Sequence, residues 1–190
     1  PPEWDDLELE LKATRMARQG VGYPTLEGFR VVNPDTLQDV PADATTIGEI
    51  WIRGNTVMKG YLKNPSASEE AFKHGWFHSG DLATIDEEGH ITIVDRKKDM
   101  INTGGENVAS REVEECIYLM PEISEVAVIA LPHPQWIEAV TAVVTVKEGQ
   151  NTTEEAIIKH CREHLAGYKT PKQVIFQHSL PKNPSGKLLK

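Results

Sequence analysis

The sequence predicts an α+β fold in two parts, and three observations carry this prediction. Residues 28–95 form short runs of alternating polar and apolar side chains between turn residues, a pattern typical of antiparallel strands. After residue 95 the pattern changes to amphipathic helices mixed with apolar strands. The chain has 190 residues, 39% hydrophobic and 26% charged, which is ordinary for a globular protein with a buried core. We therefore expect one domain at residues 1–97 and a second at residues 98–190.

The first part is expected to consist mainly of strands. Runs with strand patterning cover residues 29–32, 49–53, 82–85 and 90–94. The last two runs flank Asp86-Glu87-Glu88-Gly89, a polar segment with a glycine that is typical of a hairpin loop. Ser66, followed three positions later by Glu69, forms a capping box and predicts the start of a short helix.

The second part is expected to combine helices with a sheet. Val113, Cys116, Ile117 and Met120 recur at helical spacing, which predicts a helix over residues 110–120. Strands are expected at residues 125–131, 139–146 and 173–176, of which the second is nearly all apolar and therefore central. Before the third of these, the run Thr152-Thr153-Glu154-Glu155 predicts a helix start, and the inward-facing residues are expected to be Ile157, Ile158, Cys161 and Leu165.

Charge is distributed unevenly along the chain. The formal net charge of −9 argues against nonspecific binding to DNA or RNA, because such binding needs a basic surface, so no nucleic-acid partner is expected. Residues 159–190 nevertheless contain seven basic side chains and a single acid, Glu163. This basic C-terminal segment is either a solvated face or a surface that meets an anion such as a phosphate.

Two features bear on compartment. No apolar run approaches the roughly 18 residues of a membrane span, and the first residues do not form a signal peptide, so we expect no membrane span. Cys116 and Cys161 form neither a disulfide framework nor a zinc knuckle. A reducing, cytoplasmic location is the expectation.

Two short motifs suggest chemistry that the rest of the sequence does not support. The segment from His160 to His164 matches the inverted zincin pattern HxxEH, but no third ligand is evident in the sequence, so we expect no metal site. The Ser185-Gly186-Lys187 run differs from a phosphate-binding Walker A loop. Pro181 stands at the position of the first glycine and Leu188 at the position of the final Ser or Thr.

Two other motifs have both a structural and a functional interpretation. Gly104 and Gly105 lie between a short apolar run and a helix, where they serve either a plain turn or the close approach of a ligand to the backbone. Asp81 directly follows Gly80 and precedes a strand. It is either a turn residue or a carboxylate that accepts hydrogen bonds from a vicinal diol such as a ribose.

In order and with their spacing, four segments resemble the adenylate-forming superfamily, which includes acyl-CoA synthetases, firefly luciferases and the adenylation domains of peptide synthetases. The matching segments are residues 48–54 with Gly60-Tyr61, residues 76–81, residues 95–114 and residues 181–187. The resemblance covers essentially the whole chain. It implies that residues 1–97 are the β-rich end of the large N-terminal domain, where the family has a distorted barrel. It also implies that residues 98–190 are a mobile C-terminal domain of mixed sheet and helices.

The resemblance assigns nucleotide roles in the first part and a hinge at the boundary. Asp81 matches the residue that binds the ribose hydroxyls of ATP and of the acyl-adenylate, and Arg96 matches a contact to the same nucleotide region. Lys98 matches the hinge position about which the C-terminal domain swings.

Further roles fall in the second part. Gly104, Gly105 and Glu106 match the segment that lines the pantetheine path of CoA, and Gly104-Gly105-Glu106-Asn107 is most similar to fatty or medium-chain acyl-CoA synthetases. Lys187 matches the catalytic lysine, whose ammonium contacts the carboxylate and the α-phosphate as the adenylate forms. A fixed positive charge there stabilises the negative charge of the transition state.

The implied function is ATP-dependent ligation of a carboxylic acid to CoA, releasing AMP and pyrophosphate. ATP, CoA and Mg²⁺ are the expected cofactors, a small carboxylic acid is the expected substrate, and a homodimer is a further expectation. The alternatives are a luciferase-like or carrier-protein-loading adenylating enzyme, or a noncatalytic module that binds CoA or a nucleotide.

Two departures from the family pattern stand out. The family often has a Gly-Glu pair where this chain has Ile137-Glu138. The glycine-rich Ser/Thr phosphate loop and the Tyr-Gly-x-Thr-Glu adenine segment of the family are also absent from these 190 residues. We therefore expect these elements and the Mg²⁺ ligands to lie upstream of Pro1, and this part alone to be inactive.

Overall fold

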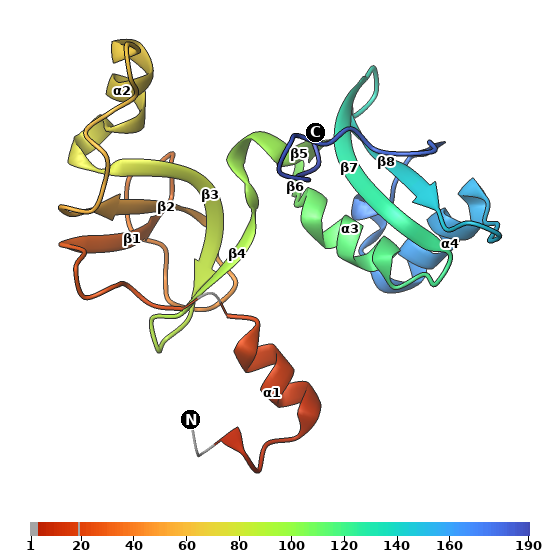
Figure 1. Ribbon diagram of the computed structural model, residues 1–190, viewed down its shortest axis with the longest axis horizontal. Helices are drawn as coiled ribbons and strands as arrows, with labels where there is room; N and C mark the ends of the chain where they lie inside the picture. Colours follow the sequence, from red (N-terminus) through yellow and green to blue (C-terminus); the bar gives the residue numbers. More distant parts are fainter. Residues whose placement is uncertain (1–3, 19) are drawn as a thin grey trace. The chain divides into compact units, whose positions relative to one another are not determined.

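The computed structural model describes residues 4–18 and 20–190. The chain divides into two compact units, Pro1–Lys97 and Lys98–Lys190 (Figure 1). Both units combine sheets and helices, in agreement with the α+β class expected from the sequence. None of the helices in the described ranges is long and apolar enough to cross a membrane.

The first unit is built on a four-stranded antiparallel sheet with the order β1-β2-β3-β4. Its strands are β1 (Gly28–Val32), β2 (Gly48–Arg53), β3 (Phe77–Ile85) and β4 (Ile91–Arg96). The sheet buries Val32, Trp51 and Ala83 almost completely. In the described residues this sheet is open and does not close into a barrel.

Short helices complete the first unit. They are α1 (Leu9–Met16), α2 (Pro65–Ala71) and the 3-10 turn η2 (Lys73–Gly75). The predicted capping box of Ser66 and Glu69 is wrong, because the helix begins earlier. Asn64 is the N-cap, and its side-chain oxygen accepts a hydrogen bond from the Ala67 N–H at 3.1 Å. Pro65 favours this start, since proline is well suited to the first helical position.

The second unit is a five-stranded sheet with two helices. Its strands are β5 (Ile101–Thr103), β6 (Glu106–Val108), β7 (Ile123–His133), β8 (Ile137–Val146) and β9 (Gln173–Phe176). The order is β6-β5-β8-β7, all antiparallel, and β9 adds to β8 as a parallel neighbour. Its helical elements are α3 (Ser110–Tyr118), α4 (Glu154–His164) and the 3-10 turn η4 (Gly167–Lys169). A further 3-10 turn, η3 (Lys97–Asp99), includes the last residue of the first unit and the first two of the second.

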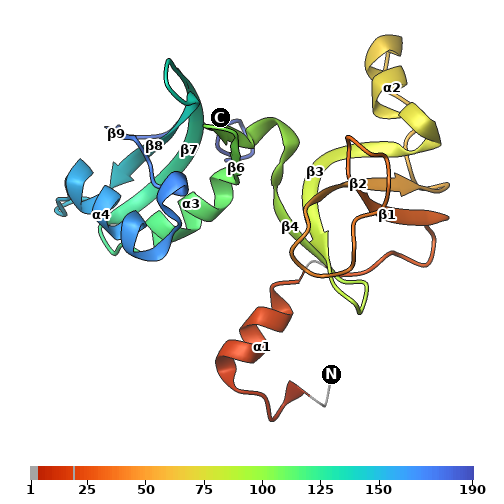
Figure 2. The same ribbon diagram turned by 180° about the vertical axis from the view of Figure 1, so that it is seen from behind.

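The sheet of the second unit is covered on both faces. Helices α3 and α4 lie side by side along one face of the sheet (Figures 1 and 2). On this face Val113 and Ile157 are fully buried against strand residues such as Val126 and Val144. Because side chains alternate along a strand, Ala127 and Val143 point to the opposite face. The C-terminal segment covers that face through Leu180 and Leu188. Because Leu188 packs there, it fixes the position of the preceding residue, Lys187.

Candidate functional site

Asp81 lies in β3 directly opposite Arg96 of β4. The Arg96 Nε atom is 3.7 Å from Asp81 Oδ1, and the two side chains are 39% (Asp81) and 46% (Arg96) exposed. Because this distance is longer than a hydrogen bond, the carboxylate keeps lone pairs for other donors. The arrangement suits a ligand with two adjacent hydroxyl groups and a negative charge nearby.

A buried carboxylate, Glu49, supports the strand that carries Asp81. Glu49 is 3% exposed, and its Oε1 accepts a hydrogen bond at 3.2 Å from the N–H of Gly80, the residue before Asp81. Its Oε2 accepts hydrogen bonds from the Trp51 indole and the Lys97 ammonium, each at 3.3 Å. Gly80 has φ +75°, a conformation that glycine adopts without steric cost.

Sequence reasoning assigned no role to Glu49, although a signal was present. In a strand, residues two positions apart share a face, so Glu49 had to lie beside the large apolar side chain of Trp51. A buried acid needs partners, and the Gly80 N–H and Lys97 provide them.

Lys98 is the first residue of the second unit. Its side chain is 68% exposed, and its Nζ lies 3.9 Å from Asp99 Oδ1. The hinge role implied by the resemblance therefore falls on an exposed side chain within a single 3-10 turn, η3.

Gly104 and Gly105 form the two-residue turn between β5 and β6, with φ values of +64° and +90°. Two consecutive positive φ angles are typical of a hairpin turn that glycine favours. The Gly104 N–H donates to the Trp136 carbonyl at 2.8 Å, whereas a Cβ on Gly105 would meet nothing within 4 Å. Glu106 is exposed directly after the turn. The turn geometry thus accounts for both glycines and leaves open space beside Gly105.

The segment that faces this turn contains the departure noted in the sequence. Ile137 has φ +68° and is 69% exposed, an unusual conformation for a β-branched residue. The glycine that the family often has here would adopt it freely. The next residue, Glu138, accepts a hydrogen bond from the Asn102 N–H at 2.7 Å and so holds the end of β5.

A groove of about 520 Å³ shares Trp136 with the Gly104 turn. The Trp136 ring stacks on His133 with a centroid distance of 4.5 Å, and Lys172 Nζ lies 5.0 Å from the Trp136 ring centroid. Arg162 supplies a second cation, and the buried hydroxyl of Thr170 has no hydrogen-bond partner among the described residues. Two cations, a flat aromatic surface and a hydroxyl suit a phosphorylated ligand with an aromatic ring.

Lys187 lies on a turn in the C-terminal segment. The Asn183 side-chain oxygen accepts hydrogen bonds from the Ser185 N–H at 3.0 Å and the Lys187 N–H at 2.9 Å, and Gly186 adopts φ +82°. The Lys187 side chain is exposed, and its ammonium forms no ion pair within residues 4–18 and 20–190. An ammonium without an internal partner remains available to an external anion.

The flanks of this turn are held by two other lysines. Lys182 forms an ion pair with Glu125 of β7. Lys190 Nζ lies 2.7 Å from Glu114 Oε1 and 2.6 Å from the Ser110 hydroxyl, both on α3. The basic C-terminal segment therefore includes structural contacts as well as the free ammonium of Lys187.

Comparison with known proteins identifies the family. Residues 112–187 match the family described as AMP-binding enzyme C-terminal domain. Acetate–CoA ligase CCL3 of Humulus lupulus is 50% identical over 194 residues, which covers 100% of this chain and 34% of that protein. The chain belongs to the adenylate-forming, AMP-binding enzyme family. Butyrate–CoA ligase AAE11 of Arabidopsis thaliana is 47% identical and covers 99% of the chain.

The fold agrees with this membership. ATP-bound MatB from Rhodopseudomonas palustris superposes with a TM-score of 0.83 at 38% identity, over 90% of this chain and 34% of that one. The chain thus spans about a third of the length of the relatives it matches.

The relatives correct one expectation. A cytoplasmic location is contradicted, because the butyrate–CoA ligase and four other plant relatives are peroxisomal by name. The two free, buried cysteines are compatible with any reducing environment and do not distinguish one such compartment from another. Two free cysteines therefore could not support the prediction of a cytoplasmic location over another reducing compartment.

The sequence places the Mg²⁺ ligands upstream of Pro1, and the described residues bring no three carboxylates together for this ion. The group formed by Asp86, Glu88 and His90 is the nearest candidate, but the Arg18 guanidinium lies 2.9 Å from Asp86 Oδ2 and 2.8 Å from Glu88 Oε2. The guanidinium lowers the pKa of Glu88 and already forms an ion pair with each of the two carboxylates.

Proposed function

We propose that this chain forms part of an ATP-dependent carboxylate–CoA ligase that makes an acyl-adenylate and then an acyl-CoA, releasing pyrophosphate and AMP. The observation that carries the proposal is the Gly104–Gly105 turn beside a basic, aromatic groove, on the same unit as the free ammonium of Lys187. Named relatives ligate acetate and butyrate to CoA, which supports the reaction class.

In the first half-reaction, a carboxylate oxygen attacks the α-phosphorus of ATP and pyrophosphate leaves. Asp81 accepts hydrogen bonds from the ribose hydroxyls, and Arg96 contributes positive charge beside them. Lys187 brings its ammonium to the carboxylate and the α-phosphate, where it stabilises the developing charge.

In the second half-reaction, the CoA thiolate attacks the acyl carbon and AMP leaves. The second unit swings about Lys98, which withdraws Lys187 and presents the Gly104–Gly105 turn. The open space beside Gly105 admits the thin pantetheine arm past Glu106. The groove formed with Trp136 then receives the nucleotide end of CoA, whose phosphates meet Arg162 and Lys172.

The acid is proposed to be a small aliphatic carboxylate. The Gly104–Asn107 segment favours the fatty and medium-chain subclass, and the acetate and butyrate ligases among the relatives extend the range to short chains. The acid pocket itself is expected outside this chain, so these residues set the chemistry and not the chain length.

Calorimetric titration of the 190-residue chain with CoA tests the role of the groove. We expect CoA to bind and pantetheine, which lacks the nucleotide, to bind at least roughly tenfold more weakly, since charged hydrogen bonds to phosphate contribute about 1.5–3 kcal/mol each. Arg162→Ala and Lys172→Ala should each weaken the binding of CoA. Lys159→Ala is the control and should leave CoA binding unchanged. Lys159 is an exposed lysine on α4, the helix that carries Arg162, and it pairs with Glu163.

Two outcomes would reject the CoA assignment. One is equal affinity for CoA and pantetheine, and the other is binding of a carrier protein with no response to CoA, which would favour a carrier-loading enzyme. ATP–pyrophosphate exchange by this chain alone would contradict the expectation that it is inactive without the upstream part.

A further inference from the structure

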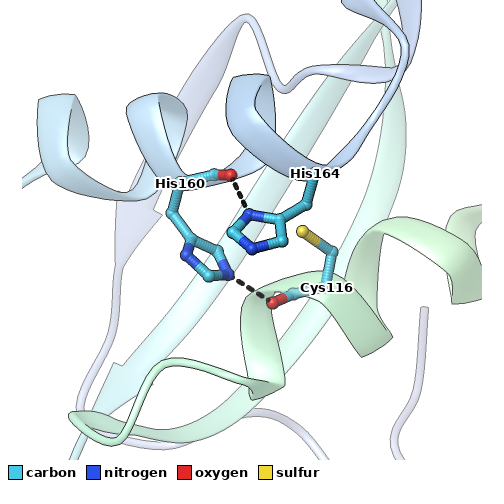
Figure 3. Close-up of side chains that lie close together, drawn as sticks. All are labelled: Cys116, His160 and His164. Atoms are coloured by element: carbon cyan, nitrogen blue, oxygen red, sulfur yellow. Dashed lines mark hydrogen bonds between the residues drawn. The ribbon is translucent and has the colours of Figure 1, made fainter.

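Three side chains with soft or borderline ligand atoms meet between the two helices of the second unit. Cys116 comes from α3, and His160 and His164 are one turn apart on α4 (Figure 3). The sulfur and one nitrogen from each imidazole ring all lie within 4.8 Å of one another. The sequence showed the histidine pair without a third ligand, and the fold supplies Cys116.

Hydrogen bonds to backbone carbonyls orient both rings. His164 Nδ1–H donates to the His160 carbonyl at 2.8 Å, which leaves the lone pair of His164 Nε2 available. His160 Nε2–H donates to the Cys116 carbonyl at 3.0 Å, and the two ring centroids are 4.3 Å apart (Figure 3). Metal-binding histidines are commonly oriented by such a bond from the second ring nitrogen to a carbonyl. At His164 that bond is already present.

The burial of the three residues suits a small cation at the edge of the unit. Cys116 is 6% exposed, His160 is half-buried and His164 is exposed, so the group is open to solvent on the His164 side. Three protein ligands of the Cys-His-His type leave a fourth tetrahedral position for water, which is a geometry that Zn²⁺ adopts.

We propose that Cys116, His160 and His164 form a Zn²⁺ site that ties α3 to α4. The choice of metal follows from the ligands, because thiolate and imidazole favour Zn²⁺ over Mg²⁺ or Ca²⁺, which prefer oxygen. Binding exchanges the Cys116 S–H bond for an S–Zn bond, and the proton passes to the buffer. If His160 binds through Nε2, its proton moves to Nδ1 and the bond to the Cys116 carbonyl is replaced by the metal.

The surroundings of Cys116 disfavour its thiolate, a cost that the metal must overcome. Burial and then Glu112 raise the pKa of the Cys116 thiol, so the metal-free site carries a protonated sulfur and zinc must displace one proton. The neighbouring Cys161 is fully buried, and burial raises its pKa to about 12, so it stays a thiol. The Asp86, Glu88 and His90 group differs, because the Arg18 guanidinium already occupies it.

The test uses the whole 190-residue chain with Zn²⁺ and with Co²⁺ as a spectroscopic substitute. We expect one equivalent of Zn²⁺ to bind, measured by competition with a chromophoric chelator, and to raise the melting temperature. Co²⁺ should give a sulfur-to-cobalt charge-transfer band together with the visible absorption of a tetrahedral ion. Mg²⁺ should have no effect on either measurement.

Variants distinguish the site from nonspecific binding. His164→Asn changes an exposed residue and leaves the fold intact, and it should lower Zn²⁺ affinity by more than the roughly 10–100-fold that outer-shell changes cost. Cys116→Ser should abolish the charge-transfer band. His178→Asn, at an exposed histidine on the same unit, should leave the Zn²⁺ affinity and the charge-transfer band unchanged.

Three results would overturn the site. The first is Zn²⁺ binding that is equal in the parent chain and in His164→Asn. The second is a cobalt spectrum with no sulfur band, and the third is loss of binding in His178→Asn.

Discussion

Asp81 and Lys187, two of the charged residues proposed to act on ATP, are held by different kinds of structure. Asp81 lies within a sheet, and the residue before it is held by the buried carboxylate of Glu49. Lys187 lies on an exposed turn, and only the flanks of that turn are anchored, by Lys182 and Lys190. The difference matches the proposed tasks. A group that holds the nucleotide through both half-reactions needs a fixed position, which a rigid strand provides. A group that must leave after the first half-reaction needs to move, which a separate segment allows.

The lysines of the C-terminal segment also differ from one another, because some form ion pairs with acids of the same unit and others do not. Lys169 pairs with Glu112 at 2.7 Å, Lys182 with Glu125, and Lys190 with Glu114. The basic C-terminal segment is thus partly a set of ties to acids on α3 and β7. Lys187 forms no such ion pair in the described ranges, and unlike Lys172, which lies over the Trp136 ring, it has no aromatic contact either.

The largest expected effect is that of Lys187→Ala in the full-length protein, assayed for the proposed ligase reaction. Loss of the charge should slow adenylate formation by about 10²–10³-fold, the usual cost of removing a preorganised electrostatic group, and spare thioester formation from supplied acyl-adenylate. Pyrophosphate exchange and thioester assays measure the two halves. Lys182→Ala in the same turn removes only a structural ion pair and should change either rate far less. Equal loss of both half-reactions in Lys187→Ala would contradict the comparison.

Asp81→Asn should affect both half-reactions, because in the proposed mechanism the ribose stays bound through both of them. Losing the charge-assisted acceptor should raise the KM for ATP by roughly tenfold or more, since such hydrogen bonds contribute about 1.5–3 kcal/mol. Steady-state kinetics and AMP binding by calorimetry provide the readouts. If Asp81→Asn slowed only the first half-reaction, its proposed difference from Lys187 would disappear.

The regular elements were predictable because their patterns are local. Strand β9 was expected at residues 173–176 and lies there, and the helical spacing of Val113, Cys116 and Ile117 identified α3 with its buried face. Strand β8 was expected to be central, and it pairs with β7 on one side and β9 on the other. In α3 one face contacts the core, so the helical spacing reflects burial. In β8 both faces are covered, so the strand is nearly all apolar.

The candidate sites were less predictable because they depend on contacts between distant segments. The Asn102–Glu138 hydrogen bond and the meeting of Cys116 with His160 join residues 36 and 44 positions apart. Short strands such as β5 and β6 have only three residues each, too few to show a period. Resemblance to a family supplied the roles of Asp81 and Lys187, and these roles remain predictions.

A third prediction concerns the support beneath Asp81. Glu49→Gln should destabilise the first unit by about 1–3 kcal/mol, because the Lys97 ammonium loses its buried counter-charge and the hydrogen bonds of Trp51 and Gly80 are weakened. Thermal and urea unfolding measure the change.

Glu125→Gln provides the matched control, because Glu125 pairs with Lys182 beside the turn that carries Lys187. The Lys182 ammonium and the Leu180 N–H lower the pKa of Glu125, so this ion pair is intact at neutral pH and is lost as pH falls through the lowered pKa. Because the pair lies near the surface, Glu125→Gln should change stability much less than Glu49→Gln. A larger effect at Glu125 would show that the C-terminal turn, and not the sheet, is the rigid region.

The smallest expected effect is a gain in stability from Ile137→Gly. A left-handed conformation costs an L-residue about 1–2 kcal/mol, while glycine adds roughly 0.5–1 kcal/mol of entropy to the unfolded chain, so the net gain should be about 0.5–1 kcal/mol. Little packing is lost, because Ile137 is 69% exposed. Ile137→Ala keeps a Cβ and should gain less. Urea unfolding provides the free energies, and destabilisation by glycine would show that the isoleucine side chain makes a contribution its exposure does not suggest. Stabilisation without any change in CoA affinity would mean that glycine at this position serves the backbone that places Glu138 against β5, and not the ligand.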